Sequence, residues 1–178
     1  MATFIRALIV AGIEVPLDAA HELEHGYESL ARSEIVPMSD GSHIIETLDG
    51  SQDKLKVTIR GRGTVPVGLQ GVAFDGPVLI KCAGPRAITS ASRVITLPAA
   101  RRSDVGSEPY GRAYVGGEWV STPVSPAGNI YTLDEVANAK HYQCVYFPEI
   151  LAVIEGGGVI ESRSRGSNST WSMTCWEA

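Results

Sequence analysis

His21, Glu22 and His25 are the residues of this chain whose types and spacing suggest a chemical reaction. They spell H-E-x-x-H, in which two histidines bind Zn²⁺ and the glutamate acts as general base in many zinc peptidases. That chemistry needs a helix, because residues four apart share one face there. On a strand the two imidazoles would lie about 13 Å apart, too far to share a metal ion. The local secondary structure therefore decides between an enzyme and a non-enzyme.

The segment around the motif, from Asp18 to Ala31, fits a strand better than a helix. Its Ala, Glu and Leu residues favour a helix, and Leu23 and Tyr27 are spaced as on one helical face. Gly26, however, interrupts that pattern after two turns. A strand would place His25 on the same face as Leu23 and Tyr27. We therefore predict an extended segment.

The other chemistry-bearing residues form no catalytic or cofactor motif. The motif lacks the H-E-x-x-H-x-x-G-x-x-H continuation, and no G-x-S-x-G nucleophile elbow occurs. Gly61-x-Gly63 lacks the Gly-Lys-Ser/Thr of a phosphate loop. We expect a protein that is not an enzyme, with no catalytic, cofactor-binding or metal-binding residues. The alternative is a zinc metallopeptidase that uses His21, Glu22 and His25.

The chain has three cysteines, Cys82, Cys144 and Cys175, with no C-x-x-C pair. An odd count argues against a disulfide framework and fits a reducing compartment. We predict buried structural thiols. The alternative is a shared metal ion or iron–sulfur cluster, which would need a fourth ligand from a histidine or a neighbouring subunit.

Six aromatic residues offer a further alternative, a surface carbohydrate-binding β-sandwich. Aromatic side chains are also enriched at subunit interfaces and in cores, and we favour those roles here. The six are Trp119, Trp171, Trp176, Tyr110, Tyr114 and Tyr131.

The composition is that of a globular protein, with 178 residues, 44% hydrophobic and 20% charged. The net charge of −5 argues against nucleic-acid binding. No run of eighteen apolar residues occurs, so we expect no membrane span. The one basic pair, Arg101-Arg102, is followed at once by Asp104, and we expect a solvated loop there.

Short segments in which apolar and polar residues alternate are separated by Gly, Pro and Asp-Gly turns. This pattern predicts some ten strands and almost no helix. The expected fold is all-β, an antiparallel β-sandwich or barrel with long loops. Residues 1–97 and 141–178 would form the sandwich core, and 98–140 an elaborated loop or small insertion with a helical turn at Asp134–Lys140. The expected strands are 3–10, 13–16, 33–38, 43–48, 54–60, 77–82, one or two in 86–97, 118–124, one or two in 141–154, 159–163 and 170–176.

Several stretches resemble the small tail-tip proteins of long-tailed bacteriophages. One runs from Tyr27 to Gly41 and ends in Met-Ser-Asp-Gly. Another runs from Val57 to Asp75 and contains Pro-Val-Gly-Leu-Gln-Gly-Val. A third, Lys81 to Ile88, has one glycine more than the family pattern. The Tyr-Gln-Cys-Val-Tyr-Phe-Pro stretch at 142–148 and the Trp-Ser-Met-Thr stretch at 171–174 also fit.

The resemblance implies a distal-tail-like structural protein of the virion, made in the host cytoplasm. In such relatives the segment equivalent to residues 21–30 is extended and has no preserved histidine pair. Copies form a ring that joins the tail tube to the hub and to fibre or receptor-binding proteins. One β domain pairs strands between neighbouring subunits, and a second β domain carries the fibres. Loops 61–76 and 98–140 would then be contact surfaces. Another small tail-tip component is an alternative identity.

Overall fold

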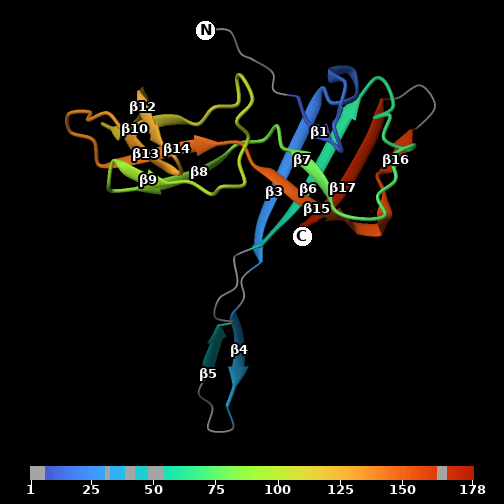
Figure 1. Ribbon diagram of the computed structural model, residues 1–178, viewed down its shortest axis with the longest axis horizontal. Helices are drawn as coiled ribbons and strands as arrows, with labels where there is room; N and C mark the ends of the chain where they lie inside the picture. Colours follow the sequence, from blue (N-terminus) through green and yellow to red (C-terminus); the bar gives the residue numbers. More distant parts are fainter. Residues whose placement is uncertain (1–6, 31–32, 39–42, 48–53, 164–167) are drawn as a thin grey trace. The chain divides into compact units, whose positions relative to one another are not determined.

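The computed structural model describes residues 7–30, 33–38, 43–47, 54–163 and 168–178 (Figure 1). The fold is all-β and sandwich-like, as the sequence predicts. Its antiparallel strands form sheets of eight, four and three strands, and a further sheet of two. The described residues contain no α-helix and two single-turn 3-10 helices, η1 (Leu17–Ala19) and η2 (Glu155–Gly157). None of them forms a helix long and apolar enough to cross a membrane.

The chain folds into two compact units, and it passes between them more than once. Unit 1 comprises Met1–Leu17 and Leu79–Ile150, and unit 2 comprises Asp18–Val78 and Leu151–Ala178. Residues 98–140, expected as an elaborated loop or insertion, contribute four strands to unit 1. Tight turns such as Gly116-Gly117, where both φ angles are positive, separate these strands and give the segment its loop-like composition.

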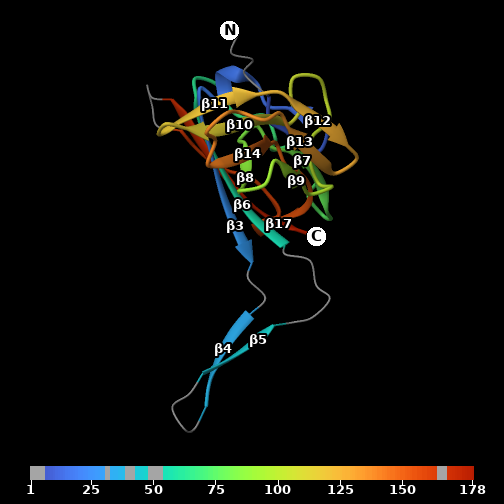
Figure 2. The same cartoon turned by 90° about the vertical axis from the view of Figure 1, so that its left-hand side faces the viewer.

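Unit 1 is built around two facing sheets. The four-stranded sheet has the order β11 (Glu118–Thr122), β10 (Tyr110–Val115), β14 (His141–Tyr146) and β8 (Arg86–Ser90) (Figure 2). The three-stranded sheet has the order β12 (Val124–Ala127), β13 (Ile130–Leu133) and β9 (Val94–Thr96). Their shared core consists of Ile95, Leu97, Ala113, Tyr131, Leu133, Tyr142, Cys144 and Tyr146.

A short hairpin and a third strand complete unit 1. The hairpin joins β1 (Ile9–Val10) and β2 (Ile13–Glu14), and β1 also pairs with β7 (Val78–Lys81). Ala11 and Gly12 both have positive φ, which is the two-residue turn that closes a tight hairpin. The predicted opening hairpin is confirmed for the described residues.

Unit 2 contains the antiparallel strands β16 (Ile160–Arg163), β17 (Ser169–Glu177), β6 (Lys54–Gly63) and β3 (Glu22–Leu30), in that order. The end of β15 (Glu149–Ile154) also pairs with β17. In β6, Val57 and Ile59 are buried, as their alternation predicts. The predicted hairpin after β3 is present as β4 (Ser33–Pro37) and β5 (His43–Thr47), a two-stranded sheet of its own (Figure 1).

Two local expectations are wrong. Strand β6 continues through Gly61 to Gly63, where a loop was expected. A Cβ atom at Gly61 would meet the Trp171 indole, so glycine permits this close approach inside a strand. Residues 134–140 form no helical turn, since Asn138 has a positive φ of 63°. The turns expected between strands 33–38 and 43–48 and between strands 43–48 and 54–60 lie outside the described residues. Of the last expected turn, 166–168, only Asn168 is described.

Candidate functional site

The H-E-x-x-H segment is extended, as predicted. Glu22 and His25 lie in β3, and His21 precedes that strand. The side chains of Leu23, His25 and Tyr27 are half-buried on one face, whereas Glu22 lies on the exposed face. No group of three His, Cys, Asp or Glu side chains among the described residues is arranged to hold a metal ion. The strand thus separates the two histidines that a helix would bring together.

His25 has a half-buried imidazole beside the Tyr27 ring, at a centroid distance of 6.0 Å. Its Nε2 atom is buried, and no described group lies within hydrogen-bond distance of it. Burial lowers the pKa of His25 from 6.5 to about 4, because the charged form loses its hydration. His25 is therefore a neutral side chain of the sheet at physiological pH.

We expect acid to destabilise the protein through His25. The unfolded chain binds a proton near pH 6.5 and the folded chain only near pH 4, so stability falls as pH drops across that window. His25→Phe should reduce this loss by about 1–3 kcal/mol. Urea unfolding at pH 7 and pH 4.5 measures the loss of unfolding free energy between the two pH values. His21→Phe is the matched control, because His21 is exposed. An imidazole of His25 that titrates near 6.5 by NMR would contradict the buried placement.

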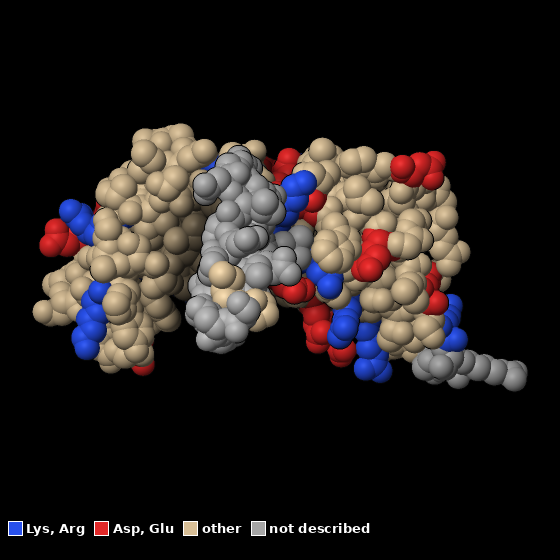
Figure 3. Space-filling view, turned by 90° about the horizontal axis from the view of Figure 1, so that it is seen from below, with Lys and Arg blue, Asp and Glu red and all other residues tan. Residues whose placement is uncertain are grey.

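A groove of about 380 Å³ lies on the outer face of the unit 2 sheet, over β3, β6, β17 and β16. Arg62 lies 3.7 Å from Glu22 across the two strands, and Arg60 is opposite Glu24. Ile160, which is 75% exposed, forms an apolar side of the groove. Figure 3 shows charged side chains of both signs on the face of the molecule that is seen from below. The groove is therefore a mixed-charge surface, in which Glu22 and Glu24 of β3 face Arg62 and Arg60 of β6.

The outer edge of β3 is the most distinctive feature of unit 2. Strand β3 is nine residues long and pairs with β6 on one side, and no described strand pairs with its other side. The Leu55 N–H donates to the Glu177 carboxylate of β17, at 2.9 Å. The Leu55 N–H thus points toward β17 and away from β3, so Ser29 and Leu55 form a pair without hydrogen bonds to each other. In such an antiparallel pair both N–H groups point away from the partner strand, and the N–H of Ser29 therefore points away from β6. The outer edge of β3 thus presents backbone donors to a further strand.

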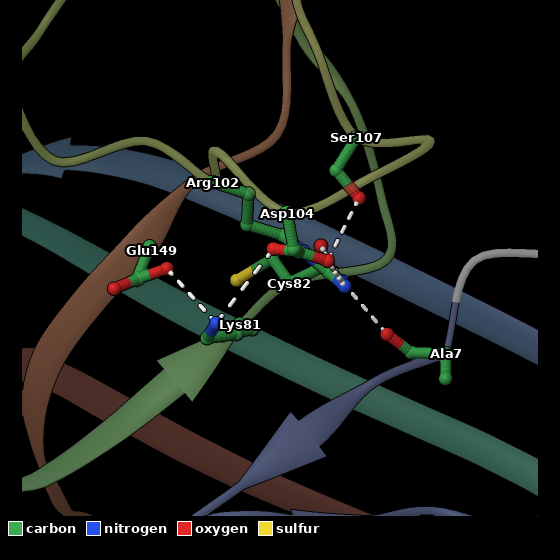
Figure 4. Close-up of polar contacts among 7 residues, drawn as sticks. All are labelled: Ala7, Lys81, Cys82, Arg102, Asp104, Ser107 and Glu149. Atoms are coloured by element: carbon green, nitrogen blue, oxygen red, sulfur yellow. Dashed lines mark hydrogen bonds and ion pairs between the residues drawn. The ribbon is translucent and has the colours of Figure 1, made fainter.

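Arg102 is the centre of a buried polar cluster in unit 1 (Figure 4). Its side chain is 4% exposed, so the expectation of a solvated loop is wrong at this residue. Nη1 donates to the Ala7 and Cys82 carbonyls, at 2.7 and 3.1 Å. Nε and Nη2 donate to both carboxylate oxygens of Asp104, at 3.1 and 2.6 Å. Four of the five N–H groups of the guanidinium therefore donate to an acceptor.

Two further side chains bind Asp104. Ser107 donates to it at 3.3 Å, and the Lys81 ammonium lies 3.7 Å away and 3.6 Å from Glu149. The hydrogen bond from Arg102 is the main reason that the pKa of Asp104 falls from 3.8 to about 2. The cluster thus ties the segments around Ala7, Cys82 and Arg102 of unit 1 together.

The cysteines are buried and reduced, as predicted. Cys144 lies in the core between the two sheets of unit 1. Burial is the main reason that its pKa rises to about 11. A thiol with that pKa is protonated at neutral pH and is therefore a poor nucleophile. In the described ranges, neither Cys82 nor Cys175 belongs to a metal-binding group.

The six aromatic residues do not form one platform. Trp171 and Tyr131 are buried, and Trp171 Nε1 donates to the Ala19 carbonyl at 2.8 Å. Trp176, on the opposite face of β17, lies under the Lys56 ammonium at 4.8 Å. Trp119, by contrast, packs on Tyr114 with ring centroids 5.1 Å apart and remains 40% exposed. The sequence did not distinguish these roles, because burial depends on which strands become neighbours.

No family model, no curated protein and no solved structure matches this chain. The likeness to phage tail-tip proteins therefore rests on the sequence stretches alone and stays a prediction.

Proposed function

We propose that this protein is a structural component of a phage tail tip, distal-tail-like, that acts by strand pairing between subunits. The observation that carries the proposal is the outer edge of β3, with which no described strand pairs. An open edge of this length in a large sheet is a template for pairing with another chain. The sequence stretches that resemble tail-tip proteins supply the biological setting.

The β4–β5 hairpin supports the same proposal. A two-stranded sheet is marginally stable by itself in water, and β4 and β5 pair only with each other among the described strands. Its register places Ile35 opposite Ile45 and Val36 opposite Ile44, so the hairpin is rich in β-branched residues. A hairpin of this kind gains stability when it packs against a neighbouring subunit.

Strand β16 provides a second edge, since it pairs with β17 alone among the strands that the structure describes. Two different edges on one molecule allow head-to-tail contacts, and these close into a ring when the rotation between subunits permits. In the proposed assembly the ring joins the tail tube to the hub and to fibre or receptor-binding proteins. It would be built in the host cytoplasm and reside in the virion tail.

Ser29→Pro tests the proposal at the edge itself. Proline removes the N–H that points away from β6 and leaves the β3–β6 hydrogen bonds in place. We expect the wild-type chain to form closed oligomers at high concentration, and Ser29→Pro to shift the mass distribution toward the monomer. Sedimentation velocity and negative-stain images of the particles provide the measurement.

Ser29→Ala is the matched control, because it changes the same exposed side chain and keeps the N–H; it should assemble as the wild type does. A wild-type chain that stays monomeric at high concentration and binds no tail tube, hub or fibre protein would refute the proposal. Equal assembly of Ser29→Pro and Ser29→Ala would show that the contact does not use this edge.

A further inference from the structure

We infer that the outer face of the four-stranded sheet in unit 1 binds a neutral saccharide. The starting observation is a row of three rings across neighbouring strands. Trp119 of β11 is opposite Tyr114 of β10, which is opposite His141 of β14. The Tyr114 ring lies 5.1 Å from Trp119 and 6.5 Å from His141, measured between centroids. Trp119 and His141 are exposed and Tyr114 is half-buried.

This row is not needed for the core of unit 1. The opposite face of the same strands carries Ala113, Tyr142 and Cys144, which pack against the three-stranded sheet. Side chains alternate along β10 and β14, so Tyr114 and His141 belong to the face that points away from this core. The rings on that face are therefore accessible to a ligand.

The next row along the same face is polar throughout. Arg112 is opposite Ser121 on one side and Gln143 on the other, and Gln143 is opposite Thr89. The Arg112 guanidinium lies over the Tyr110 ring at 5.2 Å and donates to its hydroxyl at 3.3 Å. Gln143 donates to Thr89 at 3.3 Å. These contacts hold the Arg112 guanidinium and the Gln143 amide in fixed positions before a ligand binds. Each of the two groups has several hydrogen-bonding atoms.

The two rows together fit the chemistry of a pyranose. A sugar ring has an apolar C–H face, which packs on an aromatic ring, and a rim of hydroxyls, which need donors and acceptors. Adjacent rows on one face of a strand lie about 7 Å apart, which is comparable to the size of one sugar ring. Neither row contains a carboxylate, and the guanidinium of Arg112 keeps its charge while it lies over the Tyr110 ring and donates to its hydroxyl. The remaining side chains of the polar row offer only hydroxyl and amide groups, and a neutral saccharide is the ligand class that matches these. This inference is independent of ring assembly.

The test is binding of the full chain to an array of neutral oligosaccharides that contain glucose, galactose, rhamnose and N-acetylhexosamines. Calorimetry on the best oligosaccharide then gives the affinity. We expect Trp119→Ala to weaken binding at least about tenfold, because one stacked ring is lost. Gln143→Ala should weaken it too, since the hydroxyl contacts are lost.

Trp176→Ala is the matched control, because it removes another exposed tryptophan from unit 2 and should leave the affinity unchanged. Circular dichroism checks that each variant folds. No binding to any of these oligosaccharides, or equal binding by wild type and Trp119→Ala, would overturn the inference. So would a Trp119→Ala variant that loses only self-association, which would make this face a protein interface.

Discussion

Arg102→Ala is expected to lower the free energy of unfolding by about 3–5 kcal/mol. The substitution removes the bidentate partner of Asp104, which keeps only Ser107 and Lys81, and it removes the donor from the Ala7 and Cys82 carbonyls. Because Arg102 is 4% exposed, water cannot replace these hydrogen bonds without opening the unit. Urea unfolding followed by circular dichroism measures the loss.

Arg93→Ala is the control for this prediction, since Arg93 forms an exposed ion pair with Glu135 at 3.8 Å in the same unit. It should cost no more than about 1 kcal/mol. A similar cost for both variants would show that the Arg102 cluster is solvated in solution.

Acid tests the same cluster independently. The pKa of Asp104 is about 2 in the folded protein and 3.8 in the unfolded chain. The stabilisation that the ionised carboxylate contributes is therefore complete above about pH 4 and is lost as the pH falls toward 2. In Asp104→Asn the drop in stability between pH 4 and pH 2 should be smaller than in the wild type.

Trp171→Ala is expected to cost about 3–5 kcal/mol, because it empties a large volume in unit 2. The indole packs directly on Gly61, is 3% exposed, and donates to the Ala19 carbonyl. The substitution therefore leaves a cavity and also deprives a buried carbonyl of its donor. Thermal and urea unfolding of the full chain provide the measurement.

Trp176→Ala serves as the control on the same strand. Trp176 is 36% exposed and contacts the Lys56 ammonium on the outer face of the sheet, so its removal should cost no more than about 1 kcal/mol. Equal losses for the two tryptophans would mean that β17 does not bury the face that the structure assigns to the core.

The sequence predicted the structure well wherever the signal was local. A strand at the H-E-x-x-H segment was predicted from Gly26, from the alternation of Leu23, His25 and Tyr27 and from the resemblance to tail-tip proteins. This strand argued against the zinc site. Side-chain alternation and turn residues are properties of a few neighbouring residues, and they also predicted β6, the opening hairpin and the last hairpin. The all-β class followed from the same signals.

The sequence failed where burial depends on distant partners. Arg102 belongs to a basic pair that looks solvated, yet its acceptors include the carbonyl of Ala7, 95 residues away. Gly61 looked like the start of a loop, whereas Trp171 of another strand makes it part of β6. Neither contact can be predicted from the residues that are neighbours in the sequence.

By itself, then, the sequence determined that the chain is made of short antiparallel strands and which side chains share each strand face. Only the tertiary structure decided how those faces are used: which arginine is buried, which tryptophan is exposed beside Tyr114, and which strand edge is left unpaired. The physical reason is that a strand has two faces and two edges of equal local character. Non-local pairing decides which of them face the core and which face the solvent.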